Sequence, residues 1–592
     1  VPSPELALPV LGEYDVVVVG GGTSGAPAAI SAARAGARTL VVEYLHALGG
    51  TGTVGLIGIY CAGYREGFTA EVDRGIKAIG SPTYVVGKQE YWRREIRQAG
   101  GDIWFGVLGC GAYRVGDKVA GVIVATPEGR GVVLAKVVVD GSGNADVATA
   151  AGAEVAYNSA DDEAMQGSGL CYRAPGASYI NTDWTYVDEV DMVDVTTVMI
   201  AAKRKFRSAY DLCQLIDTRE RRRIVGDLTL DPLDIINQRR FPDTIQISQG
   251  GKLDKHGAPV HPYYFVNNHR GGLSYTPYRC ILPRGLDGLL VVGLGLSAHR
   301  DAIPSVRMQP CLQNLGYAAG RAAAMAAKGG LPTRGIDLKA LQAHLVEIKC
   351  LTPDVPEHVD SYPLPIAELE AAARQLAEKD YAKLGLLMAD VERSLPLLRA
   401  AYASAATPEG KLRVAHILGM LGDGTGIETL IAVIGGTEDY GEENISYYFP
   451  NITWLDSYIL AAGFSRDRRA LPVLHARAEK LFSQASGEWK HVRSMLMALE
   501  AQGSKESLPL VAAYAKKPGR IRPAIRDVIT DVRQRNRSGS LELVVSRVLY
   551  NLGDSDGFAE AVLHDFSQDV RGHYRRHALA VLAQGPGKAL RP

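Results

Sequence analysis

Hydrophobic residues at the start of the chain follow the periods of strand and helix in turn. Residues 15–19, an aspartate and four valines, predict a short strand buried on both faces of a parallel sheet. The alanine-rich stretch 26–35 predicts a helix that Gly36 ends, and 38–43 predicts a second strand. Together these segments predict a β-α-β unit.

Later apolar segments extend the same sheet. The valine-rich segments 119–125 and 132–139 predict a hairpin, 289–292 predicts a late strand, and the alanine-rich segment 309–328 predicts a helix. The region between the hairpin and the late strand mixes short polar and aromatic strands with a charged stretch, 196–223, that we expect to be helical. The pattern predicts an α/β Rossmann-type domain with an inserted mixed α+β domain.

The pattern changes after the glycines at 329–330. From about residue 365 the sequence reads as amphipathic helices whose short turns recur at irregular intervals of roughly 37–50 residues. This spacing favours an all-α domain of stacked HEAT-like pairs, and an irregular helical bundle is the alternative. The expected divisions are 1–155 and 281–335 for the two parts of the nucleotide-binding domain, 156–280 for a substrate or cap domain, 336–364 for a linker and 365–592 for the helical domain.

Composition narrows the class of protein. Lys+Arg and Asp+Glu are 65 each, so the net charge is zero and a nucleic-acid partner is not expected. No apolar run reaches about 18 residues, so we expect no membrane span. The seven cysteines form no C-x-x-C pair, and no metal site is expected. The first residues, Val-Pro-Ser-Pro, fit either a mature end left by signal removal, with a periplasmic or secreted protein, or a cytoplasmic one.

The turn after the first strand carries a dinucleotide-binding motif. Gly20, Gly22 and Gly25 satisfy G-x-G-x-x-G between strand and helix. They allow a tight turn, close approach to a diphosphate, and packing of helix on strand. Glu43, eighteen residues after Gly25, ends the second strand, where a carboxylate can accept hydrogen bonds from ribose hydroxyls.

Three later segments favour FAD over a nicotinamide cofactor. They are the glycine-rich loop 48–53, the end of a strand at 137–143, and the late return to the sheet at 288–293. We expect the cofactor to contact Gly20, Gly22, Thr23, Ser24, Gly25, Glu43, Gly49, Gly50, Thr51, Gly52, Thr53, Asp140, Gly141, Gly293 and Arg307.

The order of these pieces resembles the FAD-dependent oxidoreductase family of the glutathione-reductase-type FAD fold, in its fumarate-reductase-like branch. The resemblance covers roughly residues 13–330 and is strongest from Tyr275 through Gly293 to Gly320. Leu294 stands where the branch commonly has arginine, and His299-Arg300 replaces its Thr-His pair. The resemblance therefore implies the fold and FAD more firmly than the chemistry.

A separate nicotinamide site is not expected. Gly293-Leu-Gly295 resembles a second glycine motif, but its helix is delayed past Pro304 and no further β-α-β unit is visible. Electrons should therefore pass between a small-molecule substrate and oxygen, a quinone or a carrier protein.

Candidate catalytic residues lie in two polar clusters. His299 and His261 are candidate bases, Arg307 can hold a carboxylate or stabilise charge on reduced flavin, and Tyr278 belongs to the tyrosine-rich cluster after His261. The structural alternatives are hydrogen-bonded or surface histidines and packed aromatic side chains. His46 and Cys61 are two further candidates, each for covalent attachment of FAD. For Cys61 the alternative is a small side chain packed in the core.

Three functions remain open at this point. The first is an FAD oxidase or dehydrogenase that oxidises a CH–OH group of a small polar substrate, with sugars as one example. The second is a fumarate-reductase-like C–C bond dehydrogenase or reductase that uses arginines to clamp a carboxylate. The third is a flavin-bearing docking protein that binds a protein partner on its helical repeats.

Overall fold

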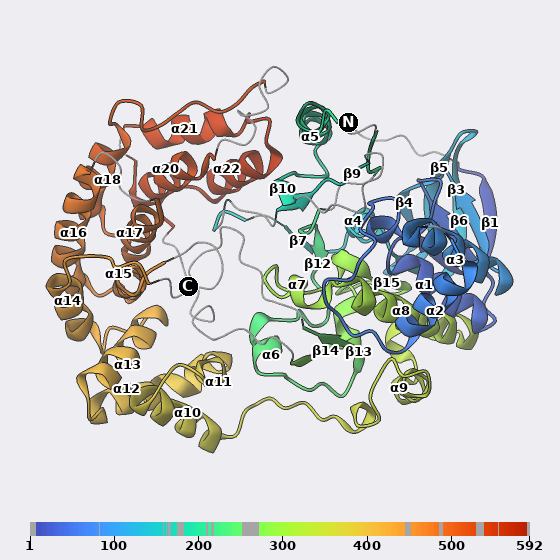
Figure 1. Ribbon diagram of the computed structural model, residues 1–592, viewed down its shortest axis with the longest axis horizontal. Coiled ribbons are helices and arrows are strands. Elements are labelled where there is room, and N and C mark those ends of the chain that lie inside the picture. Colours follow the sequence, from blue (N-terminus) through green and yellow to red (C-terminus); the bar gives the residue numbers. More distant parts are fainter. Residues whose placement is uncertain are drawn as a thin grey trace.

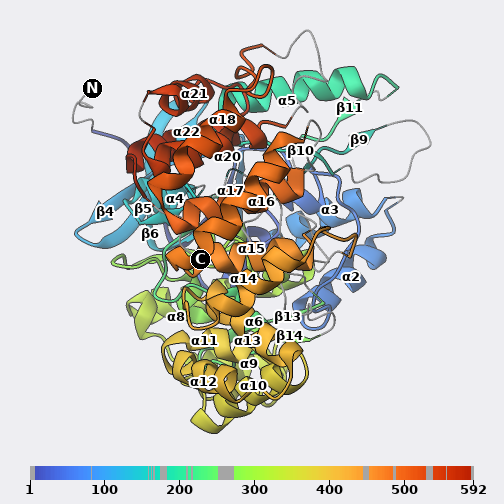
Figure 2. The same cartoon turned by 90° about the vertical axis from the view of Figure 1, so that its left-hand side faces the viewer.

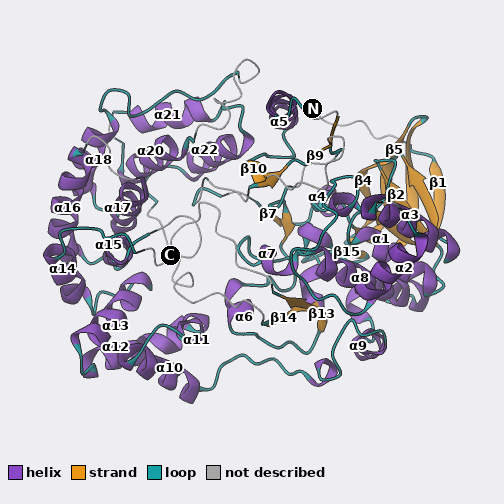
Figure 3. Cartoon of the chain, in the orientation of Figure 1, coloured by secondary structure: helices purple, strands orange, loops and turns teal. Residues whose placement is uncertain are grey.

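The fold has an α/β part and an arc of helices. The computed structural model describes residues 7–588 apart from 82, 158, 162, 164–166, 174–182, 209–210, 215–217, 251–271, 444–451, 485–488, 528–537 and 555. In Figure 1 the first 350 residues or so form the α/β part, and the rest of the chain curves away from it and back. Figure 3 shows the described residues of the arc as helices and loops, without a strand among them.

The α/β part is built on one seven-stranded mixed sheet. Its strand order is β3-β2-β1-β6-β5-β4, and β15 also pairs with β6. The bounds are β1 Val10–Val19, β2 Thr39–Glu43, β3 Asp102–Phe105, β4 Leu108–Val115, β5 Lys118–Thr126, β6 Gly129–Asp140 and β15 Leu289–Val291. Neighbours among β3, β2, β1, β6 and β15 are parallel, whereas β4 and β5 are antiparallel. The predicted Rossmann-like core and the hairpin are confirmed.

Two helices cross in close contact on this sheet. They are α1 (Gly25–Arg34) and α8 (Gln309–Gly329). A Cβ atom added at Gly316 or Gly320 would lie 2.0 Å from the carbonyl oxygen of Ser24 or Ala28, respectively. Because only glycine permits this approach, the middle of α8 is held against the first turn of α1.

Further helices and short strands complete the α/β part. The helices are α2 Phe68–Ile79, α3 Tyr84–Gln98, α4 Asp146–Ala150, α5 Met192–Lys205, α6 Pro232–Ile236, α7 Ile303–Val306 and α9 Leu338–Glu347. The short strands are β7 Val155–Ala156, β8 Ser168–Gly169, β9 Tyr172–Arg173, β10 Asp183–Thr185, β11 Asp211–Leu212, β12 Arg223–Ile224, β13 Thr244–Gln249 and β14 Leu273–Pro277.

Two segments differ from the sequence expectation. The charged stretch 196–223 is helical only as far as Lys205; of its other described residues, those at 218–222 form a loop that leads into β12. Charged residues of this loop are buried against other segments, and these contacts replace helical hydrogen bonds. The expected linker at 336–364 contains α9, whose Leu341 and Leu345 are fully buried.

The described part of the arc consists of successive helices, most of them joined by short turns. They are α10 Ile366–Glu378, α11 Leu384–Ala389, α12 Val391–Ser404, α13 Pro408–Met420, α14 Ile427–Gly436, α15 Trp454–Phe464, α16 Leu471–Ser483, α17 Trp489–Gln502, α18 Leu508–Ala515, α20 Ser540–Leu552, α21 Phe558–Phe566 and α22 Gly572–Gln584. The predicted helical C-terminal region is confirmed, and its HEAT-like character stays a prediction. None of the described helices combines the length and hydrophobicity needed to cross a bilayer.

Both ends of the arc pack on the α/β part, as Figures 1 and 2 show. At the first end, the Asn237 side chain donates a 2.8 Å hydrogen bond to the carbonyl of Gly385 in α11. At the second, the backbone N–H of Gly572 donates a 2.8 Å hydrogen bond to Asp194 of α5, and Arg576 forms an ion pair with Asp188. The arc is therefore anchored at two places.

Candidate functional site

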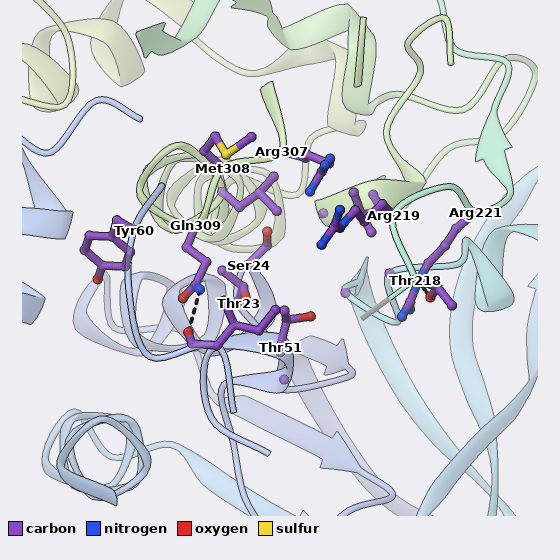
Figure 4. Close-up of a pocket in the computed structure, with 18 of the residues that line it drawn as sticks. Thr23, Ser24, Thr51, Tyr60, Thr218, Arg219, Arg221, Arg307, Met308 and Gln309 are labelled. Carbon is purple, nitrogen blue, oxygen red and sulfur yellow. Dashed lines mark hydrogen bonds between the residues drawn. The ribbon is translucent and has the colours of Figure 1, made fainter. Parts of the chain in front are cut away.

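A cavity of about 300 Å³ lies at the end of the sheet where β1 and β6 finish. Figure 4 shows it between the first turns of α1 and α8. It is lined by Gly22, Thr23, Ser24, Gly50, Thr51, Ile57, Ile59, Tyr60, Cys61, Gly141, Ser142, Gly143, Thr218, Arg219, Arg221, Gly293, Leu294, Arg307, Met308, Gln309 and Leu312. The loops after β1, β2, β6 and β15 thus meet at one place, as expected for a ligand site at the carboxyl ends of parallel strands.

The glycine motif forms one wall of the cavity. Gly20 has a φ of +86°, and a Cβ atom at Gly25 would lie 1.8 Å from the Gly20 carbonyl oxygen. This packing lets α1 begin directly under the turn, with Ser24 as its N-cap residue. Ser24 is buried, and its hydroxyl has no hydrogen-bond partner among the described residues. A ligand acceptor in the cavity would satisfy it.

The loop after β2 supplies a second wall. Gly49 has a φ of +102°, and its N–H donates a 2.7 Å hydrogen bond to the Gly21 carbonyl, which ties this loop to the glycine motif. Gly50 and Thr51 line the cavity. Two other predicted residues of the loop lie behind it: a Cβ at Gly52 would meet the Gln309 side chain, and the Thr53 hydroxyl donates to the Leu48 carbonyl at 2.6 Å.

The two predicted carboxylates do not line the cavity. Glu43 accepts 2.9 Å hydrogen bonds from the N–H groups of Gly21 and Leu45, and burial raises the pKa of its carboxyl group. Asp140 is fully buried and accepts hydrogen bonds from Ser142 and from the N–H of Ala148 at 2.9 Å. Each carboxylate therefore holds the backbone of a loop in place by hydrogen bonds, and other residues of that loop line the cavity.

The first turn of α8 closes the cavity from the other side. Arg307, Met308 and Gln309 line the cavity, with Met308 as N-cap and Gln309 as the first residue of the helix. Helices α1 and α8 therefore both begin at the cavity, and the positive ends of their dipoles favour a negatively charged ligand there.

Arginines from the loop before β12 complete the lining and were not predicted. Thr218, Arg219 and Arg221 line the cavity at the end away from Tyr60 (Figure 4). Arg221 Nε lies 2.8 Å from Glu189 Oε1, and burial raises the pKa of Glu189 to about 7. Glu220, between the two arginines, is buried as well, so no alternation of the sequence could have indicated them.

Of the predicted catalytic residues that the structure describes, Arg307 lines the cavity, and Tyr278 and His299 lie apart from it. The Tyr278 hydroxyl is buried and donates a 2.8 Å hydrogen bond to the Thr333 carbonyl. His299 is exposed, and its Nδ1 accepts a 3.2 Å hydrogen bond from the N–H of Asp301. His261 lies outside the described residues. Of the two alternatives for covalent attachment, Cys61 lines the cavity and His46 does not.

The lining fits FAD in its chemistry. Exposed glycine backbone, the Ser24 hydroxyl, two helix N-termini and three arginines suit a diphosphate. Ile57, Tyr60, Met308 and Leu312 give an apolar side that suits a flat aromatic ring. Among the described residues that line the cavity, none is an aspartate or a glutamate.

Comparison with known proteins agrees with this assignment. The family described as FAD dependent oxidoreductase matches residues 15–212 and 195–345, which is more than half of the chain. No curated protein sequence is significantly similar to the whole chain or to part of it.

Several solved structures resemble parts of the chain. The Thermovibrio ammonificans THI4 structure shares 24% identity over 23% of this chain and 61% of its own, with a TM-score of 0.20. A geranylgeranyl bacteriochlorophyll reductase-like protein from Thermoplasma acidophilum shares 15% identity over 64% of this chain and 99% of its own, with a TM-score of 0.31. OxyS anhydrotetracycline hydroxylase from Streptomyces rimosus shares 16% identity over 68% and 76%, with a TM-score of 0.27. The chain thus spans about three fifths of the first of these proteins.

Proposed function

Because the chain belongs to the FAD dependent oxidoreductase family, we propose that it oxidises a CH–OH group of a small polar substrate that carries a negative charge, by hydride transfer to flavin N5. FAD supplies the redox chemistry when it is bound. The protein's part is to position the substrate, exclude water and balance charge.

The observation that supports this proposal is the positive character of the cavity. Arg219, Arg221 and Arg307 line it together with two helix N-termini, and none of the described lining residues is acidic. Arg219 and Arg307 come from segments far apart in the sequence and lie near one another in Figure 4. A guanidinium pair of this kind can hold a carboxylate through charge-assisted hydrogen bonds.

The position of each polar group in the cavity indicates whether it would bind the cofactor or the substrate. The glycine motif, Ser24 and the loop at Gly50–Thr51 would hold the FAD diphosphate at the N-terminus of α1. Arg219 and Arg307 would hold the substrate anion. No histidine is among the described lining residues, so a base at His299 or His261 stays a prediction.

Anaerobic reduction of the bound flavin tests the substrate class. We expect purified protein to show a flavin spectrum that small 2-hydroxy acids or sugar acids bleach and neutral polyols do not. The discriminating pair is an acid and its methyl ester, which differ in charge but keep the same CH–OH group. Equal bleaching by acid and ester would contradict the role of the arginines, and no bleaching by any alcohol would contradict CH–OH oxidation.

The Arg307→Met variant tests whether Arg307 binds the negative charge of the substrate. We expect a fall in kcat/KM for the acid of about 10- to 100-fold, because a charge-assisted hydrogen bond contributes about 1.5–3 kcal/mol. The ester should react equally with both proteins. Arg307→Lys is the matched control, which keeps the charge without the two-pronged geometry and should lose less.

The arginines also favour a second function, that of a C–C bond dehydrogenase or reductase of a carboxylate substrate. In that reaction the same side chains clamp the carboxylate beside the bond that is reduced or oxidised. Rapid reoxidation of chemically reduced protein by an unsaturated acid, together with slow reoxidation by oxygen, would favour this second function over alcohol oxidation.

A further inference from the structure

Lys88 of α3 is a fully buried lysine directly behind the cavity wall. Its Nζ donates a 2.9 Å hydrogen bond to Gln309 Oε1 and a weaker one, at 3.5 Å, to the Tyr60 hydroxyl. A Cβ atom at Gly52 would lie 3.1 Å from the same nitrogen. The ammonium group thus touches the first turn of α8 and the loop after β2, both of which border the cavity.

The groups that face Lys88 compensate its positive charge only in part. Its Nζ lies 4.9 Å and 5.5 Å from the ring centroids of Tyr60 and Tyr84. The nearby carboxylate, Asp73, instead accepts hydrogen bonds from these two tyrosine hydroxyls, at 3.1 and 3.0 Å. Within the described part of the chain, no carboxylate oxygen lies within 4.0 Å of Lys88 Nζ. A buried ammonium group without a directly paired anion is costly, so a negative charge on a ligand in the cavity would favour the ammonium form over the neutral amine.

Gln309 connects this buried charge to the ligand space. Its Oε1 accepts from Lys88, and its Nε2 donates a 2.9 Å hydrogen bond to the Ile57 carbonyl, drawn as a dashed line in Figure 4. With both ends of the amide fixed, Gln309 has one orientation at the N-terminus of α8, where it lines the cavity.

We propose that Lys88 is a positioning residue that fixes the Gln309 amide and compensates, from behind the wall, the negative charge that reduction brings into the cavity. The inference rests on FAD as the cofactor of the proposed function, and not on the identity of the substrate. A hydride carries two electrons and one proton and therefore adds one net negative charge. Lys88 balances that charge by taking one proton from solvent when it is neutral before reduction, or by already being charged.

The pKa of Lys88 lies in a pH range in which reduction of the flavin can change its protonation state. Burial lowers the pKa of Lys88 to about 7, and Asp73 opposes part of that shift. A negative charge in the cavity favours the ammonium form and raises this pKa. Below pH 7 Lys88 is then charged in both redox states, and between pH 7 and the raised pKa reduction takes up one extra proton.

The reduction potential of the bound flavin, measured against reference dyes from pH 6 to pH 9, tests the proposal without any substrate. We expect Lys88→Met to lower the potential at pH 6 by at least the equivalent of a tenfold change in the reduction equilibrium, about 30 mV for two electrons. The difference from the unaltered protein should shrink as the pH rises above 7. Lys77→Met, which removes an exposed lysine of α2, is the matched control and should leave the curve unchanged.

The dependence of the reduction potential on pH in the unaltered protein tests the role of Lys88 even if Lys88→Met does not fold. The potential of the unaltered protein should fall more steeply above pH 7 than below it, because of the extra proton. Loss of a proton from the reduced flavin itself would make the fall less steep instead. A constant or flattening curve, or a Lys88→Met protein with the potential of the Lys77→Met control, would overturn the role of Lys88. A protein that binds FAD and passes this test but oxidises no alcohol would leave Lys88 in place and remove the proposed substrate.

Discussion

Replacing Gly25 by alanine is expected to abolish FAD binding, with a rise in the dissociation constant of at least 100-fold. The new methyl group would lie 1.8 Å from the Gly20 carbonyl oxygen, and a backbone atom cannot move aside as the end of a flexible side chain can. The turn would have to open, which separates the first turn of α1 from the glycine motif. The flavin-to-protein ratio after reconstitution with FAD, read from the visible spectrum, measures the effect.

Gly22→Ala separates damage to the ligand space from damage to the fold. A Cβ atom at Gly22 would meet only the Gly141 carbonyl oxygen, at 3.9 Å, although Gly22 lines the cavity. We therefore expect this variant to unfold at the temperature of the unaltered apoprotein but to bind FAD weakly. Gly435→Ala in α14, where the nearest atom would be 3.6 Å away, is the control that should change neither property. Full yellow occupancy in Gly25→Ala would show that the diphosphate is held elsewhere.

The glycine motif was predictable because its signals are local. Gly20, Gly22 and Gly25 stand between a valine strand and an alanine helix. Gly20 requires glycine for its positive φ and Gly25 for its contact with the Gly20 carbonyl, and both reasons lie within that turn. The first residue of α8 was predicted at Gln309 for a similar reason, since Pro310 sits in its first turn and the alanine pattern follows. Such features depend on neighbours within a few residues in the chain.

The parts that were missed depend on contacts between distant segments. Arg219 and Arg221 reach the cavity because their loop is held by Asn144 and Glu189, which no local pattern indicates. Glu43 stands where a ribose-binding acid was predicted, yet each of its oxygens accepts a hydrogen bond from the backbone of a neighbouring loop. The contact of the ribose with Glu43 stays a prediction.

The burial of Lys88 could have been predicted from the sequence. It lies on the same helical face as Tyr84, Tyr91 and Trp92, at spacings of three and four residues. A lysine in an apolar stripe is either extended to the surface or buried for a purpose. Periodicity could place Lys88 on the buried face, but only the fold brings it to Gln309, more than two hundred residues later in the chain.

Replacing Arg547 by methionine is expected to destabilise the end of the helical arc by about 3–5 kcal/mol, because it leaves a buried carboxylate without its cation. Arg547 of α20 and Glu500 of α17 are almost fully buried, and the guanidinium NH2 lies 2.9 Å from Glu500 Oε2. Arg547 also donates a 2.8 Å hydrogen bond to the carbonyl of Asp161 in the α/β part, so the change should loosen the arc from its second anchor. Thermal unfolding followed by far-UV circular dichroism, with the flavin signal as a separate probe of the α/β part, measures both effects.

A second arginine–glutamate pair in the same arc, on its surface, provides the control. Arg468 and Glu506 are 74% and 61% exposed, and water screens such a pair, so Arg468→Met should cost no more than about 1 kcal/mol. The double variant Glu500→Leu/Arg547→Met removes both buried charges at once, and we expect it to recover most of the lost stability, since a buried ion pair can often be replaced by apolar side chains of similar volume. If Arg547→Met were no less stable than Arg468→Met, the pair would not stabilise the arc. If the double variant were as unstable as Arg547→Met, the loss would come from the Asp161 contact rather than from the stranded carboxylate.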